Sequence, residues 1–210
     1  MQPENSLGKL DKHYTFIEQA RRKQIIEATI QVLAERGFIN TSFAKIAEKA
    51  GINQSLISYH FRDKAELTDQ VRQVIYQERF EHVSKAVAAA ESSVSKLEAY
   101  IVADITYMSE RPEFFRALVE VLFGQRDTNG MSQYMQDIDT PMFSLLQNIL
   151  VVGQKNGEFA VFSPVAVAHI IDGAKDQFLA QVPFRPSLKS KIFTNTLLTM
   201  ARQFVQQENL

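Results

Sequence analysis

The sequence predicts an all-α protein, and three of its features support that prediction. Apolar residues recur at the three- and four-residue spacing of a helix throughout the chain. Capping residues, glycines and prolines divide this pattern into segments, and no segment shows the strict alternation of a half-buried strand. With 210 residues, 45% of them hydrophobic, the chain is long enough to bury a sizeable core.

The first predicted helix covers residues 15–36, and Gly37 should end it. Arg21, Arg22 and Lys23 form a basic cluster near its start. Such a cluster is either a solvated helix face or a set of phosphate contacts, and the sequence favours neither reading.

Two short helices should follow within residues 41–64, TSFAKIAEKAGINQSLISYHFRDK. Thr41 or Ser42 caps the first, and Asn53 caps the second. Gly51 lies between them, where a helix end favours a residue that tolerates positive φ. Two helices joined by such a turn are typical of the helix-turn-helix, whose second helix enters the major groove of DNA. An ordinary helical hairpin is the alternative.

Six further helices are predicted over residues 64–90, 92–109, 112–123, 131–156, 163–182 and 187–206. Asp63, with Glu66 three residues later, predicts a capping box at the start of the first of them. Pro141 should kink or restart the helical region of residues 131–156.

The N-terminal segment resembles the DNA-binding domain of the TetR-type transcriptional regulators. The residues that carry the resemblance are Ile25-Ile26-Glu27-Ala28, Val32-Leu33, Gly37-Phe38, Thr41-Ser42, Ile46-Ala47, Ala50-Gly51-Ile52, Tyr59-His60-Phe61, Lys64 and Leu67. The detailed match covers about a quarter of the chain, and the rest matches in length and helical character only. Two positions depart from the family pattern: Ser58 stands where many members have Tyr, and Thr29 stands where Ala is usual.

The second short helix should present exposed polar side chains to base edges, and Gln54, Ser55, Ser58 and Tyr59 fit that role. The resemblance implies that other residues contact phosphates, which set position and affinity rather than sequence preference. The predicted DNA-binding residues are Thr41, Ser42, Lys45, Asn53, Gln54, Ser55, Ser58, Tyr59, His60 and Lys64.

For the remaining sequence we expect a body that binds a small, largely apolar ligand. The apolar stripes of its last two helices fit a buried internal core or a homodimer interface, and the resemblance to the family implies the interface. The middle helices of the body combine apolar residues with isolated polar ones, a composition that also fits an ordinary core. The candidate ligand pocket is Tyr107, Phe115, Leu118, Leu122, His169, Asp172 and Asp176. The candidate dimer interface is Val167, Ile171, Ala174, Phe178, Ile192, Thr196 and Met200. We expect a flexible arm over residues 1–14, a DNA-binding domain over 15–62 and this body over 63–210.

Composition argues against other classes of protein. The chain has no cysteine, and its four histidines show no metal-ligand spacing. Nucleotide-binding and hydrolase motifs are also missing, so we expect no catalytic residue, cofactor or metal. No apolar run approaches the roughly 20 residues of a membrane span, and the polar N-terminus does not read as a secretory signal, so a cytoplasmic location is expected.

Net charge is −1, and residues 1–70 carry ten Lys and Arg against nine Asp and Glu. A positive DNA-facing surface must therefore come from the placement of charges rather than their total. Repression of transcription follows from the resemblance alone. A DNA-binding protein controlled by a protein partner, without a small ligand, remains the alternative.

Overall fold

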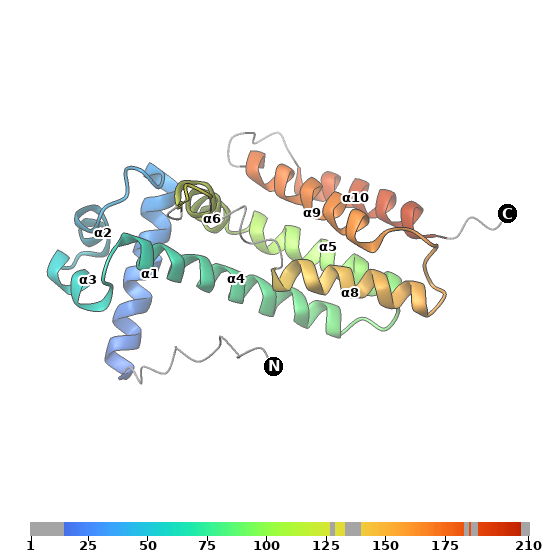
Figure 1. The fold of residues 1–210 in the computed structure, drawn as a ribbon, viewed down its shortest axis with the longest axis horizontal. Coiled ribbons are helices and arrows are strands. Elements are labelled where there is room, and N and C mark those ends of the chain that lie inside the picture. The colour runs from blue at the N-terminus through green and yellow to red at the C-terminus, as the bar shows by residue number, and fades with distance from the viewer. Residues whose placement is uncertain (1–14, 127–128, 133–139, 183–184, 186–188, 207–210) are drawn as a thin grey trace.

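The computed structural model describes residues 15–126, 129–132, 140–182, 185 and 189–206. Its helices are α1 (Phe16–Arg36), α2 (Phe43–Ala50), α3 (Gln54–His60), α4 (Lys64–Ala88), α5 (Ser93–Ser109), α6 (Pro112–Gly124), α8 (Pro141–Lys155), α9 (Pro164–Gln181) and α10 (Ser190–Val205) (Figure 1). Within these ranges there is no strand, and one isolated bridge pairs Arg126 with Ser132. The prediction of an all-α fold is confirmed.

The helices form two groups that share α4 as a link. Helices α1 to α3 form a head at one end of the molecule, and α4, α5, α8, α9 and α10 lie along the long axis as a body (Figure 1). Helix α4 leaves the head and runs into the body, where it packs mainly on α5. Helix α6 sits at the junction and packs on α1. The body therefore contacts the head through two helices.

Side-chain caps explain where most of the helices begin. Thr15 and Glu18 form a reciprocal capping box at α1. Asp63 caps α4 by accepting from the Glu66 N–H at 2.8 Å. The box predicted there is only half formed, because the Glu66 carboxylate accepts from the Arg62 N–H at 2.9 Å instead of the Asp63 N–H.

Of the helical region expected over residues 131–156, the described part contains one helix. Helix α8 begins at Pro141, with Thr140 as its N-cap. Proline is favoured in the first turn because its missing N–H is one that has no partner there. Pro141 thus starts the helix rather than kinking it. Met131 and Ser132 are not helical, and residues 133–139 lie outside the described part of the chain.

One continuous apolar core runs through head and body. On α4 the buried apolar stripe is Leu67, Val71, Ile75, Val83 and Val87. Arg79 falls on the same stripe and is 7% exposed. A buried arginine needs an anionic partner, which the body supplies from α5, as described below.

Candidate nucleic-acid interface

The turn between α2 and α3 is built by local signals. Ser42 caps α2, and Asn53 caps α3 by accepting from the Ser55 N–H at 3.0 Å. Gly51 ends α2 with φ 65° and ψ 36°, the left-handed conformation that favours glycine. A Cβ at Gly51 would meet nothing within 4 Å, so backbone conformation rather than space accounts for the glycine. These signals place α3 across α2 as a second short helix.

Helix α3 buries one side and exposes the other. Ile57 is fully buried beside Ile46 of α2, and Phe61, just after the helix, is 1% exposed. Gln54, Ser55 and Ser58 are exposed on the opposite side. Tyr59 is 73% exposed, which excludes half-buried packing for its ring in this chain. The residues expected to face base edges therefore share one free surface.

Arg22 of α1 fixes the end of α3. Its guanidinium donates to the His60 carbonyl at 2.6 Å and lies over the Phe61 ring, 4.2 Å from the centroid. Burial, and then the charge of Arg22, lower the pKa of His60. The other members of the basic cluster are also engaged within the head: Arg21 with Gln24 at 2.5 Å and Lys23 with Glu27 at 3.9 Å. Arg22 therefore stabilises the end of α3 within the head. The sequence alone left open whether this basic cluster is a solvated helix face or a set of phosphate contacts.

The residues flanking the helix-turn-helix divide into exposed and inward-turned groups. Ser42 is exposed, whereas Thr41 is 3% exposed and its hydroxyl donates to the Gly37 carbonyl at 2.8 Å. Of the two alternatives for a helix-start phosphate contact, the geometry favours Ser42. Lys45 lies nearby and donates to the Asn40 carbonyl at 2.7 Å.

Lys64 begins α4 and is turned toward the head. Its ammonium donates to the Phe38 carbonyl and lies 4.0 Å from the centroid of the Phe38 ring. Burial lowers its pKa. An ammonium has three N–H donors, so two remain for a phosphate.

The head joins α6 through the segment that follows α1. The Phe38 N–H donates to the Glu120 carboxylate at 2.7 Å. A Cβ built on Gly124 would lie 2.4 Å from Cγ of Phe38, so only glycine allows this ring to lie so close to α6. Thr68 of α4 donates to Gln125 at 3.1 Å, next to the same joint. The sequence alone did not predict this joint.

The residues predicted for the ligand pocket are divided between the apolar core and the exposed side of α9. Tyr107, Phe115, Leu118 and Leu122 are buried core residues, and the Tyr107 hydroxyl bonds the Glu78 carboxylate at 3.0 Å. His169, Asp172 and Asp176 lie on α9 with partly or largely exposed side chains. None of the seven lines either of the two cavities we describe.

Those two cavities lie elsewhere. One, of about 280 Å³, opens between the end of α4, the start of α5 and α8. The other, of about 940 Å³, is an open cleft between α1 and α4 with a polar rim that carries Glu27, Glu66, Glu78 and Glu81. The first is mainly apolar, which makes it the better candidate for an apolar ligand.

The residues predicted for the dimer interface also divide. Val167, Ile171 and Phe178 are at most 6% exposed inside a single chain, so they cannot face a partner. The reason is that α9 carries apolar residues on more than one side, and the buried stripe was taken for the free one. Ile192 (66% exposed), Met200 (48%) and Thr196 on α10 are free, whereas Ala174 is half-buried. On α9 the exposed large apolar residues are Val165, at 43%, and Ile170, at 52%.

A buried ionic cluster joins α4, α5 and α9, and the sequence analysis missed most of it. Arg79 binds Asp104 through two bonds of 2.6 and 2.7 Å. Lys175 binds Asp104 and, at 2.8 Å, Asp172, which also accepts from the Tyr100 hydroxyl at 3.0 Å. Burial alone would raise the pKa of Asp104, but the two cations outweigh it and hold that pKa well below its usual range. The available signal was a charge in an apolar stripe, at Arg79 and again at Lys175.

Comparison with known proteins agrees with this geometry. Residues 25–71 match the family model described as bacterial regulatory proteins, tetR family. Over 73 residues the chain is 36% identical to the HTH-type transcriptional regulator BetI of Yersinia pestis, which is 35% of this chain and 37% of that protein. The chain thus matches little more than a third of the length of this curated relative.

Two solved structures share the fold over most of the chain. A TetR-family regulator from Rhodococcus sp. has a TM-score of 0.77 at 19% identity and covers 89% of this chain and 100% of that one. FadR of Bacillus subtilis, solved in complex with stearoyl-CoA, has a TM-score of 0.76 at 19% identity and covers 88% of this chain and 99% of that one.

A helix-turn-helix head on a helical body defines a class of transcriptional regulators. Within that class, residues 25–71 match the tetR family model, and the chain as a whole shares the fold of solved TetR-family regulators. In the described ranges, none of the helices is both long and apolar enough to cross a membrane. The same residues contain no group of three His, Asp or Glu side chains that could hold a metal ion.

Proposed function

We propose that this protein is a homodimeric repressor that binds a pseudo-palindromic operator and releases it when a small, largely apolar molecule enters the body. In this proposal residues 15–62 are the DNA-binding domain and residues 63–210 the effector-binding and dimerisation body. The observation that carries it is the free polar surface of α3, formed by Gln54, Ser55, Ser58 and Tyr59, above a fully buried Ile57. A helix held this way presents hydrogen-bonding groups to a groove without disturbing its own core.

The remaining predicted contacts would position the head rather than read sequence. Ser42, Lys45, His60 and Lys64 flank the α3 surface, and Asn53 caps it. Thr41 is buried, so it would contribute indirectly, by stabilising the turn between α1 and α2 through its hydrogen bond to the Gly37 carbonyl. One head offers few base contacts, so a two-fold dimer that reads two half-sites is the reasonable unit.

The proposed dimer surface is the exposed side of α9 and α10. It carries Ile170, Ile192, Thr196 and Met200. Two copies of a helix pair can form a four-helix interface that buries such residues. Replacing Ile192 and Met200 by Glu should give a monomer at micromolar concentration in analytical ultracentrifugation. Val161→Glu is the matched control, because Val161 is 98% exposed and lies outside both helices.

Control by a small ligand is supported by the apolar cavity of about 280 Å³. One structural relative, FadR of Bacillus subtilis, was solved with stearoyl-CoA, a ligand that carries a long aliphatic chain. A ligand can release DNA only if it binds one arrangement of the two heads more tightly than the other.

The direct test is fluorescence anisotropy of the purified protein with DNA from the promoter upstream of its own gene cluster. We expect salt-dependent binding that prefers one pseudo-palindrome to scrambled DNA of equal length. Gln54→Ala or Ser58→Ala should change which sequence is preferred. Equal affinity for the promoter and the scrambled DNA would refute the proposal.

A further inference from the structure

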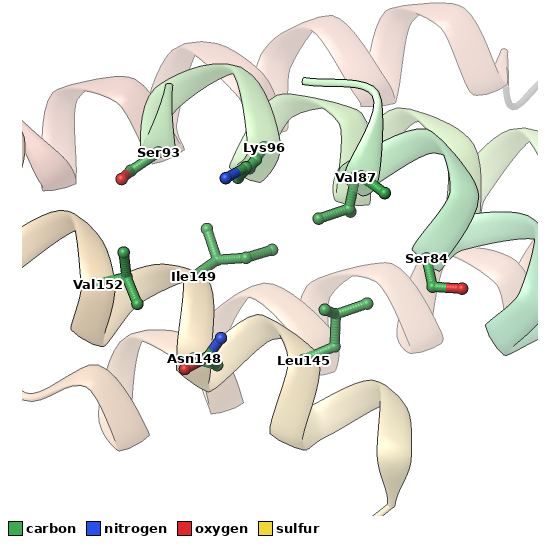
Figure 2. A pocket seen from close by; sticks show the side chains of 9 residues that line it. Ser84, Val87, Ser93, Lys96, Leu145, Asn148, Ile149 and Val152 are labelled. Carbon is green, nitrogen blue, oxygen red and sulfur yellow. The ribbon is translucent and has the colours of Figure 1, made fainter. Parts of the chain in front are cut away.

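A cavity at the far end of the body combines an apolar lining with one charged side chain. Figure 2 shows Val87, Leu145 and Ile149 reaching toward its middle, with Val152 beside them. With Ala88, these side chains give it five apolar residues among the nine described ones that line it. Its volume of about 280 Å³ is close to the lower end of the range for small-molecule sites.

Lys96 of α5 is the only charged residue among those nine. It lies across the cavity from Ile149 (Figure 2). Its ammonium has no ion-pair or hydrogen-bond partner in the described part of the chain. The nearby carboxylate of Glu158 is already engaged by Ser93, through the hydroxyl at 2.6 Å and the N–H at 2.7 Å. A half-buried cation without a partner, at the edge of an apolar cavity, favours an anion with an apolar tail.

We infer that this cavity binds an aliphatic carboxylate, with its tail against Val87, Leu145 and Ile149 and its carboxylate on Lys96, and that this ligand is the effector. The inference rests on the proposed function, since it names the class of molecule that controls DNA binding. The binding itself needs no DNA, so the two can be tested apart.

The position of the cavity gives such a ligand a mechanical route to the head. Ser84, Val87 and Ala88 of the cavity wall belong to the last turns of α4, whose first residue, Lys64, contacts Phe38 of the head. The 25 residues of α4 form one helix, which at 1.5 Å per residue is about 37 Å long. Arg79 holds α4 to Asp104 of α5 between the two ends. A tail that separates the end of α4 from α8 would therefore tilt α4 about Arg79 and shift the head.

The test is calorimetric titration of the full-length protein with octanoate, with 1-octanol and acetate as comparison ligands. We expect octanoate to bind, 1-octanol to bind about tenfold more weakly for lack of the charge, and acetate not to bind. Lys96→Ala should weaken octanoate binding about tenfold while leaving 1-octanol unchanged, and Lys96→Arg should restore it. Lys155→Ala removes the same charge from the end of α8, outside the cavity, and is the matched control.

A second variant tests the location independently of charge. Leu145→Phe places a larger side chain in the cavity and should weaken octanoate and 1-octanol alike. Operator binding without ligand, measured by anisotropy, should stay at the wild-type level in Lys96→Ala and Leu145→Phe. If promoter binding fails in the wild type, the proposed function fails, whatever octanoate does.

Three results would overturn the inference while leaving DNA binding intact. The first is that octanoate does not bind. The second is that Lys96→Ala and Leu145→Phe leave the affinity for octanoate unchanged. The third is that bound octanoate does not lower the affinity of the protein for its operator. The last result would remove the role as effector even though the cavity is occupied.

Discussion

Arg79 and Asp104 face each other across α4 and α5 with two parallel bonds, Nε to Oδ1 at 2.6 Å and Nη2 to Oδ2 at 2.7 Å. Neither side chain is more than 9% exposed. Lys175 approaches the same carboxylate from α9, so a single anion holds three helices. Removing that anion would leave two cations buried with only partial compensation from Asp172 and Asp176.

Asp104→Asn should therefore destabilise the protein by about 3–5 kcal/mol, the usual cost of removing one partner of a buried ion pair. The measurement is the free energy of unfolding from urea titrations followed by circular dichroism. Glu98→Gln is a matched control, because Glu98 pairs with Arg202 at 2.6 Å on the surface. That change should cost less than about 1 kcal/mol. Equal losses in the two variants would mean that burial of the cluster contributes little.

The same carboxylate should make stability fall in acid. The pKa of Asp104 in the folded state lies below its ordinary value of 3.8. Between these two pKa values the unfolded chain therefore binds more protons than the folded protein. The stabilisation is therefore complete above about pH 4 and is lost as pH falls through the folded-state pKa. Asp176, whose side chain is 52% exposed, is present in both proteins, so the gap in unfolding free energy between wild type and Asp104→Asn should narrow between about pH 5 and about pH 2.5. A constant gap would contradict the assignment.

Lys64→Ala tests the proposed phosphate contact. We expect weaker binding to all DNA sequences and a salt dependence shallower by about one charge, because one phosphate contact is lost. Lys85→Ala lies near the other end of the same helix and should leave the slope unchanged. If the slope were unchanged in Lys64→Ala, Lys64 would not contact a phosphate, and its role would be limited to its contacts with Phe38 inside the protein.

Gly124→Ala tests the joint between head and body. The added methyl would lie 2.4 Å from Cγ and 2.5 Å from Cβ of Phe38, and Cβ cannot move without the backbone. We expect a loss of about 1–3 kcal/mol in unfolding free energy. Gly173→Ala is the control: its methyl meets nothing within 4 Å in the middle of α9, so it should stabilise by up to about 1 kcal/mol. Adding Phe38→Ala to Gly124→Ala should relieve part of the clash, a non-additive effect.

Features set by neighbouring residues were predictable from the sequence. Caps act on N–H groups two or three residues away, so the sequence placed the start of α3 at Asn53 and that of α2 at Thr41 or Ser42. Gly51 was predictable for the same reason, because the positive φ that favours glycine belongs to this residue itself. The free surface of α3 followed once those boundaries were known.

Features set by distant partners were not predictable. Arg79 and Lys175 break apolar stripes on two helices, but their shared partner Asp104 lies 25 and 71 residues away. On α9 the three-four spacing fits both the inner stripe with Ile171 and the outer position of Ile170. Periodicity identifies an apolar stripe but not the neighbour that covers it, so three of the seven residues of the expected dimer interface were taken from the core.

The close approach of Phe38 to Gly124 has a consequence for chimaeras made by exchanging heads between regulators. A graft joined at residue 63 would carry the Phe38 ring onto a foreign α6, where any side chain in place of Gly124 would occupy the ring's position. Glu120, which receives the Phe38 N–H, would have to be transplanted as well. The unit of exchange is thus discontinuous in sequence: the first 62 residues together with the last two turns of α6.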